Sequence, residues 1–330
     1  MNVEQIVRKT LQQCINNRVN DLFLVKRDKY FQVYTKTVNQ TQHLPNLSLQ
    51  EGTAWLNYLK YCGQMNLSES RRPQLGSLIF NDTNGNNVYL RLSVVGDFRN
   101  RESLVIRFIY PLLSHLQVIY EQQLQLLQSL LAQSGLIVLS GPVNAGKTTT
   151  LYYLAQQIVN NKTILTIEDP VEIINDDFIQ LQVNEHAQMT YYELLKLSLR
   201  HHPDVLIIGE IRDEQTANAA LRAALAGSTV LTTVHARCAW GVMQRLLDFK
   251  VDRIHLQNCL RAISYQQLLP VNDQYQILFD IITGSELLTR QSQLHHNNWL
   301  NLLRQAYEDG QINKEVYQET SASCPTSIFF

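Results

Sequence analysis

The sequence lacks long apolar runs, and this absence limits how the protein can meet a membrane. No stretch approaches the roughly 20 consecutive apolar residues that a membrane-spanning helix requires. The first residues, MNVEQIVRKTLQQC, also lack the apolar centre of a signal peptide. We therefore expect a cytoplasmic protein, associated with the inner face of the membrane only through a partner.

Neither sign of charge is in excess. The 28 basic and 29 acidic residues leave a formal net charge of -1. Proteins that bind nucleic acid through its phosphates usually carry a basic surface. The composition therefore disfavours a DNA or RNA translocase, and we expect no direct nucleic-acid partner.

Paired cysteines are absent as well. The five cysteines are Cys14, Cys62, Cys238, Cys259 and Cys324. They contain no C-x-x-C pair, which argues against a disulfide framework and against a four-cysteine zinc site. A reducing compartment and no zinc are expected.

The length of 330 residues suggests two domains at roughly 150 residues each. The sequence pattern of residues 1–112 predicts a smaller N-terminal α+β domain. Its expected elements are a helix, two short strands, a second helix and three more strands. The Asn84-Gly85 pair indicates a turn between two of these strands. Pro111 marks the expected boundary, because the leucine spacing becomes helical after it.

Residues 113–330 predict an α/β domain. From Gly135, apolar strand candidates alternate with helical segments, which is typical of a mainly parallel sheet covered by helices on both faces. The C-terminal part is predicted to be mostly helical, with one strand candidate, YQILFDII.

A phosphate-binding loop is predicted in GPVNAGKTTTLYYL, which follows the apolar run GLIVLS. Its Gly141, Gly146, Lys147 and Thr148 fit the pattern G-x-x-x-x-G-K-[ST]. Backbone N–H groups of such a loop converge on phosphate oxygens, the lysine reaches the β and γ phosphates, and the hydroxyl binds Mg²⁺. A chance match in a glycine turn is the alternative, but the strand before and the helix after favour the loop. The expected nucleotide contacts are Gly141, Pro142, Val143, Asn144, Ala145, Gly146, Lys147, Thr148 and Thr149.

A second acidic group should help to organise magnesium and water at the end of a neighbouring strand. DVLIIGEIRD supplies Glu210 at such a place. Alternatively, this segment is an ordinary strand exit, followed by a helix cap at Asp213. Next to a phosphate loop, the functional interpretation is favoured.

Two more strand ends carry candidate catalytic residues. Glu168 ends the apolar strand of TILTIEDPVEI and is a candidate for the base that orients or deprotonates water. His235 follows the strand of VLTTVHARC and suits a sensor of the γ-phosphate, although a lone histidine there is usually structural. Cys238 completes only H-x-x-C, which is too little for a metal site.

Together these motifs resemble those of the secretion ATPases of type II secretion and type IV pilus systems, most closely the short competence pilus assembly ATPases of Gram-positive bacteria. The resemblance rests on a Walker A motif, an aspartate box, a Walker B motif and a histidine box, which read GPVNAGKTTTLYYL, TIEDPVE, DVLIIGEIRDEQTA and TTVHA. It implies a RecA-like P-loop NTPase domain with a smaller PAS-like N-terminal domain. It also implies ATP and Mg²⁺ as cofactors, a homohexamer, and a polytopic membrane platform protein as partner.

The resemblance also implies that the N-terminal domain has a role in catalysis. Family members supply arginines to the γ-phosphate from two strands of this domain, and the matching residues are Arg91 in LRLSVVG and Arg107 in LVIRFIY. The alternative for both is an arginine on an exposed strand.

Some family features are missing. We expect neither the additional N-terminal docking domain nor the four-cysteine zinc module of the family's larger members, a departure that concerns how the protein engages its membrane partner. The usual Q-R-L reads Gln266-Gln267-Leu268, and the glycine-histidine pair after the Walker B helix reads Gly227-Ser228. These departures affect expected subunit contacts but none of the four motifs.

The expected function is a hexameric ATP-hydrolysing motor that powers assembly of a competence pilus and thereby DNA uptake. A pilus retraction motor, or another type II secretion ATPase, shares the motifs, but the A-I-R-A-G-E stretch usual in retraction motors is absent. A nucleotide-gated scaffold that no longer hydrolyses ATP is the alternative of another class.

Overall fold

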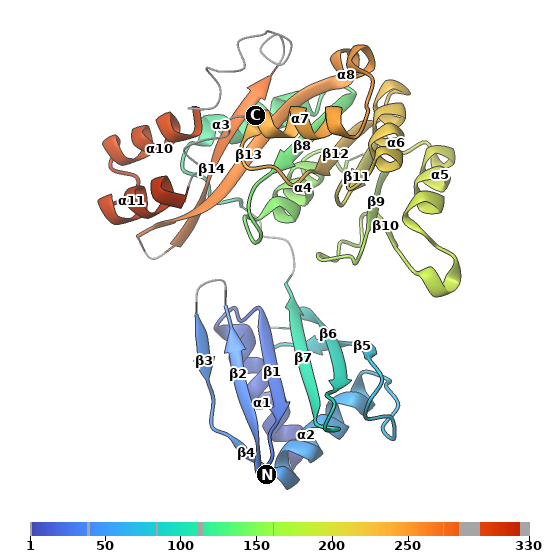
Figure 1. Ribbon diagram of the computed structural model, residues 1–330, viewed down its shortest axis with the longest axis vertical. Coiled ribbons are helices and arrows are strands. Elements are labelled where there is room, and N and C mark those ends of the chain that lie inside the picture. Colours follow the sequence, from blue (N-terminus) through green and yellow to red (C-terminus); the bar gives the residue numbers. More distant parts are fainter. Residues whose placement is uncertain are drawn as a thin grey trace. The chain divides into compact units, whose positions relative to one another are not determined.

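The computed structural model describes residues 2–37, 40–83, 85–110, 115–160, 162–272, 274–283 and 298–323. The chain divides into two compact units, Met1–Pro111 and Leu112–Phe330, each with its own sheet (Figure 1). Asn84, Pro111 and Cys324, which figured in the sequence expectations, lie outside the described residues. No helix within the described ranges is long and apolar enough to cross a membrane.

The N-terminal unit is an antiparallel sheet with two helices. The sheet has the order β3-β2-β1-β7-β6-β5, and β4 pairs with β2. The elements are α1 (Val3–Asn16), β1 (Asp21–Lys26), β2 (Tyr30–Lys36), β3 (Thr41–His43), β4 (Leu47–Ser48), α2 (Leu49–Cys62), β5 (Gln74–Asn81), β6 (Asn87–Gly96) and β7 (Glu102–Ile109). The two helices and the five main strands expected in this unit are all present.

The two faces of this sheet differ because residues alternate along each strand. On β6, Leu90 and Leu92 are buried in a core that includes Trp55 of α2 and Leu11 of α1. Arg91, which lies between them, is on the opposite face. This second face is not covered by α1 or α2 and carries both candidate arginines.

The second unit is an α/β domain. Its sheet has the order β10-β9-β11-β12-β8-β13-β14, and every pair is parallel except β13 with β14. The elements that precede β13 are α3 (Glu121–Leu130), β8 (Gly135–Ser140), α4 (Lys147–Gln156), β9 (Ile164–Glu168), β10 (Ile179–Gln182), α5 (Tyr191–His201), β11 (Val205–Ile208), α6 (Glu214–Leu225), β12 (Thr229–Thr233), α7 (Ala239–Asp248) and α8 (Arg253–Cys259). The elements that complete the unit are β13 (Leu260–Val271), β14 (Gln274–Thr283), α10 (Asn298–Glu308) and α11 (Lys314–Ser323).

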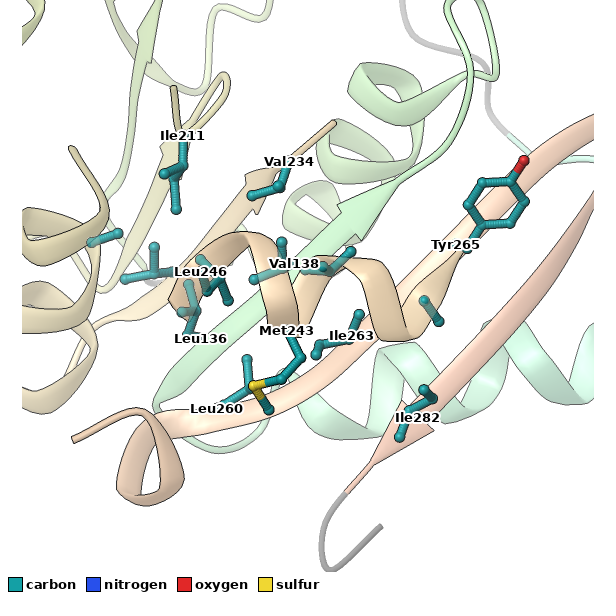
Figure 2. Packing of buried hydrophobic residues seen from close by; sticks show 14 of the residues in the cluster. Leu136, Val138, Ile211, Val234, Met243, Leu246, Leu260, Ile263, Tyr265 and Ile282 are labelled. Carbon is teal, nitrogen blue, oxygen red and sulfur yellow. The ribbon is translucent and has the colours of Figure 1, made fainter. Parts of the chain in front are cut away.

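Helices cover both faces of this sheet, as expected. Leu136 and Val138 of β8 pack with Met243 and Leu246 of α7 in one core (Figure 2). The alternate residues of β8 join a separate core with α3 and α4. β8 is therefore buried on both sides, which fixes the position of the loop that follows it.

The C-terminal part contains more strand than the sequence predicted. The expected strand YQILFDII is present as part of β14, but the 12-residue β13 before it was not expected. β13 lies between β8 and β14 and is largely buried. A strand buried on both faces does not show the two-residue alternation that identifies a strand in sequence.

Candidate active site

Four adjacent parallel strands, in the order β9-β11-β12-β8, bring the candidate residues of the second unit to one edge of the sheet. Glu168 ends β9, Glu210 follows β11, His235 follows β12, and the predicted phosphate loop follows β8. Since the strands are parallel, all four segments leave the sheet at its carboxyl edge, where α/β proteins bind ligands.

The loop between β8 and α4 has the backbone shape that a phosphate cradle requires. Gly141 has φ 150° and Gly146 has φ 79°, a region that favours glycine. A Cβ on Gly141 would lie 2.2 Å from the carbonyl oxygen of Gln266, so no larger residue fits there. Pro142, Val143 and Asn144 are exposed at the outside of the loop. These residues fit a phosphate group held by backbone N–H groups at the start of α4.

Lys147 folds over this loop. Its Nζ donates to the carbonyl oxygens of Gly141 at 2.9 Å and Pro142 at 2.8 Å. Burial lowers the pKa of the Lys147 ammonium from its ordinary value, and the nearby charges of Glu172 and Glu210 act in the opposite direction. The ammonium is thus within electrostatic reach of two carboxylates.

Thr148 contacts a carboxylate that the sequence analysis did not single out. Its hydroxyl donates to Oε2 of Glu172 at 2.7 Å, and Thr149 lies beside it in the first turn of α4. Glu172 is exposed. The signal for it was present in the sequence, because Glu172 is the last residue of TIEDPVE.

Glu168 is held inside the domain. Only 3% of this residue is exposed, and its carboxylate accepts hydrogen bonds from the Thr166 hydroxyl at 2.7 Å and from the Tyr152 hydroxyl. The backbone N–H of Glu172 also donates to it. Burial raises the pKa of Glu168, and these three hydrogen bonds lower it. Gln180 of β10 completes the network by donating to the Tyr152 oxygen at 2.6 Å.

Glu210 lies between two basic side chains. Nε2 of His235 is 3.0 Å from Oε2 of Glu210, while the guanidinium of Arg212 contacts the other carboxylate oxygen. Arg212 also reaches Asp169, with Nη1 at 3.5 Å from Oδ2. Arg212 belongs to the Glu-Ile-Arg-Asp segment but was not predicted as a site residue. These contacts link the ends of β9, β11 and β12.

Arg91 and Arg107 belong to the N-terminal unit. They are directly opposite each other on β6 and β7, and Nε of Arg107 is 2.9 Å from Oδ1 of Asp21 on β1. Two like charges in directly opposed positions on one face of a sheet repel each other. The two guanidinium groups therefore bring positive charge to this face, and Asp21 lies against one of them.

The residues of the second unit fit a nucleotide with a divalent cation. Within the described ranges, no three His, Cys, Asp or Glu side chains gather into a metal cluster. Magnesium in nucleotide sites usually takes few protein ligands and completes its shell with phosphate oxygens and water. A hydroxyl from Thr148 and a carboxylate from Glu210 or Glu172 would supply the protein's part.

Comparison with known proteins places this arrangement in a family. Competence protein ComGA of Streptococcus pneumoniae is 37% identical over 267 residues, which is 81% of this chain and 85% of the relative. Competence protein ComGA of Bacillus subtilis is 35% identical over 273 residues, covering 81% of this chain and 76% of the relative.

Two solved structures share the fold. The ATPase DotB of Legionella pneumophila has a TM-score of 0.78 at 20% identity, over 96% of this chain and 95% of that one. The pilus retraction motor PilT with bound ADP has a TM-score of 0.70 at 22% identity, over 97% of both chains. Residues 1–312 match the family described as type II/IV secretion system protein. The resemblance predicted from the four motifs is thereby confirmed, and the chain belongs to the type II/IV secretion system protein family.

Proposed function

We propose that this protein is an ATP-hydrolysing motor that powers assembly of a competence pilus. The observation that carries the proposal is the phosphate loop at the carboxyl edge of the sheet, with Thr148 bonded to Glu172 and Lys147 within electrostatic reach of Glu172 and Glu210. The choice of a competence pilus rests on the two ComGA relatives. In this proposal, residues 113–330 are a RecA-like P-loop NTPase domain and residues 1–112 a PAS-like domain.

Some site residues would bind the nucleotide and the cation, and others would take part in hydrolysis. Bound ATP with Mg²⁺ supplies the phosphoryl group and the charge that organises it. The loop N–H groups and Lys147 would hold the phosphates, and Thr148 and Glu210 would hold the cation. His235, in contact with Glu210, would sense the γ-phosphate.

Two carboxylates are candidates for activating water. Glu168 was predicted for this role, but it is buried and its carboxylate already accepts three hydrogen bonds. Glu172 is exposed and adjacent to Thr148. We retain Glu168 as the proposed base and add Glu172 as a second candidate, since a base needs hydrogen-bond reach to the water.

Arg91 and Arg107 would complete the site from the N-terminal domain of a neighbouring subunit. This proposal includes a homohexamer, in which hydrolysis moves one domain against the next subunit. The motion would be passed to a polytopic membrane platform protein, with the ring on the cytoplasmic face of the membrane and without direct contact to nucleic acid.

A pilus retraction motor is the second candidate, favoured by the fold shared with PilT. The phenotype of cells that lack the protein distinguishes an assembly motor from a retraction motor. Loss of an assembly motor removes surface pili and transformation, whereas loss of a retraction motor leaves pili on the surface. A scaffold without hydrolysis would restore pili even when its catalytic carboxylates are replaced.

The enzymatic part is tested by phosphate release from the purified protein, with mass photometry of the same sample in a non-hydrolysable ATP analogue. We expect ATP-dependent phosphate release and a ring. A protein that binds no nucleotide would contradict the proposal, and a fully active monomer would contradict its hexameric part.

A further inference from the structure

Gln266 lies beneath the phosphate loop although no motif assigned it a task there. It is on β13, which pairs with β8, and is fully buried. Its Nε2 donates to the backbone carbonyl of Ala145 at 2.7 Å and lies 3.1 Å from the Thr150 hydroxyl. A carbonyl oxygen can only accept, so the side-chain amide must present its NH₂ group to the loop.

The contact with Ala145 determines which way the next N–H group points. A trans peptide is planar, so the C=O of Ala145 and the N–H of Gly146 point in opposite directions. Because the carbonyl is directed at Gln266 on β13, the Gly146 N–H is directed away from β13. Gly146 has φ 79° and no side chain, so nothing on that residue covers its N–H.

One further contact holds the loop on the same strand. Gly141 lies so close to the Gln266 carbonyl oxygen that a Cβ would approach it to 2.2 Å. Thr150, the other partner of the Gln266 amide, also donates its backbone N–H to the carbonyl of Gly146 at 2.9 Å. The beginning of the loop and the first turn of α4 are thus both in contact with one residue of β13.

Packing alone does not explain a glutamine at this position. Its Oε1 is buried and has no hydrogen-bond partner among the described residues. A buried polar atom without a partner costs stability, and a leucine of similar size would avoid this cost. The amide therefore contributes through its NH₂ group, which satisfies the Ala145 carbonyl.

We propose that Gln266 is a positioning residue for phosphate binding, which fixes the Ala145–Gly146 peptide so that the Gly146 N–H is available to a nucleotide phosphate. The proposal rests on the proposed function, because it requires that this loop binds a nucleotide. It assigns a role to the first residue of the Gln266-Gln267-Leu268 segment, where the middle residue departs from the family's usual Q-R-L.

The test compares Gln266→Leu with Gln267→Leu, the matched change at the next residue of β13. For Gln266→Leu we expect the Kd for ADP and the KM for ATP to rise at least about tenfold, with kcat within about threefold. The Gly146 amide resonance, observed in ¹H–¹⁵N spectra, should shift less on ADP addition than in the unchanged protein. Gln267→Leu should alter none of these. A folded Gln266→Leu variant with unchanged ADP affinity overturns the proposal.

A second variant covers the case in which Gln266→Leu does not fold. In Gln266→Glu, the neutral acid can still donate an O–H to the Ala145 carbonyl, whereas the ionised form cannot. ADP affinity of this variant should therefore fall as pH rises, and Gln267→Glu should show no added pH dependence. A pH-independent Gln266→Glu overturns the proposal. Lys147→Ala distinguishes a failure of this inference from a failure of the nucleotide site: if the unchanged protein binds ADP and Lys147→Ala does not, the nucleotide site of the proposed function stands whatever Gln266 does.

Discussion

The hydroxyl of Thr148 donates to Glu172 at 2.7 Å, from the first turn of the helix that follows the phosphate loop. This contact joins the Walker A motif to the aspartate box. It also places at the predicted cation ligand a carboxylate other than Glu168, whose own carboxylate is buried and accepts from the Glu172 backbone N–H and from the Thr166 and Tyr152 hydroxyls.

Replacing the two carboxylates separately should identify the base. Glu168→Gln and Glu172→Gln keep the shape of each side chain and remove its charge, so we expect ADP binding to persist. The variant that lacks the base should lose at least about a hundredfold in kcat, the usual contribution of a general base. We expect this loss for Glu168→Gln, as proposed. Normal turnover in Glu168→Gln together with loss in Glu172→Gln would transfer the role to Glu172.

Lys147→Ala should abolish nucleotide binding and pilus function together. The change removes the cation that lies over the loop and is attracted by two carboxylates. Binding of a fluorescent ADP analogue measures the effect. Lys196→Ala is the control, since Lys196 lies exposed on α5 and its partners Glu193 and Tyr192 belong to its own helix. Hydrolysis at the unchanged rate in Lys147→Ala would refute the site.

Tyr152→Phe should change the pH dependence of hydrolysis. Hydrogen bonds to an ionised carboxylate lower its pKa, so removal of the Tyr152 hydroxyl should raise the pKa of Glu168 further. If ionised Glu168 is the base, the acid limb of kcat moves to higher pH. Tyr153→Phe, at the next position of α4, is the control. An unmoved acid limb in Tyr152→Phe would show that Glu168 does not govern turnover.

The same pKa direction has a consequence for stability. A carboxyl group whose pKa is raised by folding contributes most to stability below its unfolded-state pKa. This contribution is lost as the pH rises through the folded-state pKa, which for Glu168 lies above the ordinary carboxyl value. As the pH rises through this range, the melting temperature of the Glu168→Gln variant should fall less than that of the unchanged protein, because the glutamine side chain does not ionise.

Glu210→Gln should keep nucleotide binding and lose the dependence on magnesium. The carboxylate is the group that His235 and Arg212 contact, and its charge is what a divalent cation requires. We expect ADP affinity to become insensitive to Mg²⁺ and turnover to stop, as measured by titration of Mg²⁺ at fixed ADP. Glu214→Gln, an exposed carboxylate at the start of α6, should behave as the unchanged protein.

The sequence predicted most elements that precede α7 because their patterns are local. The β8 strand, the helix that begins at Lys147 and the alternation of β6 each follow from short-range spacing. Contacts between distant segments could not be predicted in this way. Gln266 approaches Ala145 only because β13 pairs with β8, and β13 lacked a recognisable period.

The residues of the candidate site also divide into those that local sequence patterns identified and those that they did not. Glu168, Glu210 and His235 were identified because each follows an apolar strand, and parallel strands share one carboxyl edge. Glu172 and Arg212 follow the same strands a few residues later, in loops whose path the sequence does not specify. Their contacts with Thr148 and Glu210 depend on that path.

Arg91 and Arg107 allow the two-domain mechanism to be tested, because they are opposite each other in the N-terminal unit and away from its helix-covered face. An arginine that reaches a transferring phosphoryl group stabilises its charge without being needed for binding. Arg91→Ala or Arg107→Ala should therefore leave ADP affinity within about tenfold and lower hydrolysis at least about a hundredfold. Asp21→Asn, which removes the negative charge beside Arg107 but keeps the arginine, is the matched control.

Mixing two inactive variants decides whether these arginines act on a neighbouring subunit. In a ring assembled from Arg107→Ala and Lys147→Ala subunits, an intact loop of the first kind can receive an intact arginine from the second. Partial recovery of phosphate release is therefore expected if the arginine is supplied by the neighbour. If each arginine serves its own subunit, no site in the mixed ring is complete and no activity returns. Hydrolysis at the unchanged rate in both single variants would instead make Arg91 and Arg107 ordinary strand residues, and the N-terminal domain would then serve to dock a partner.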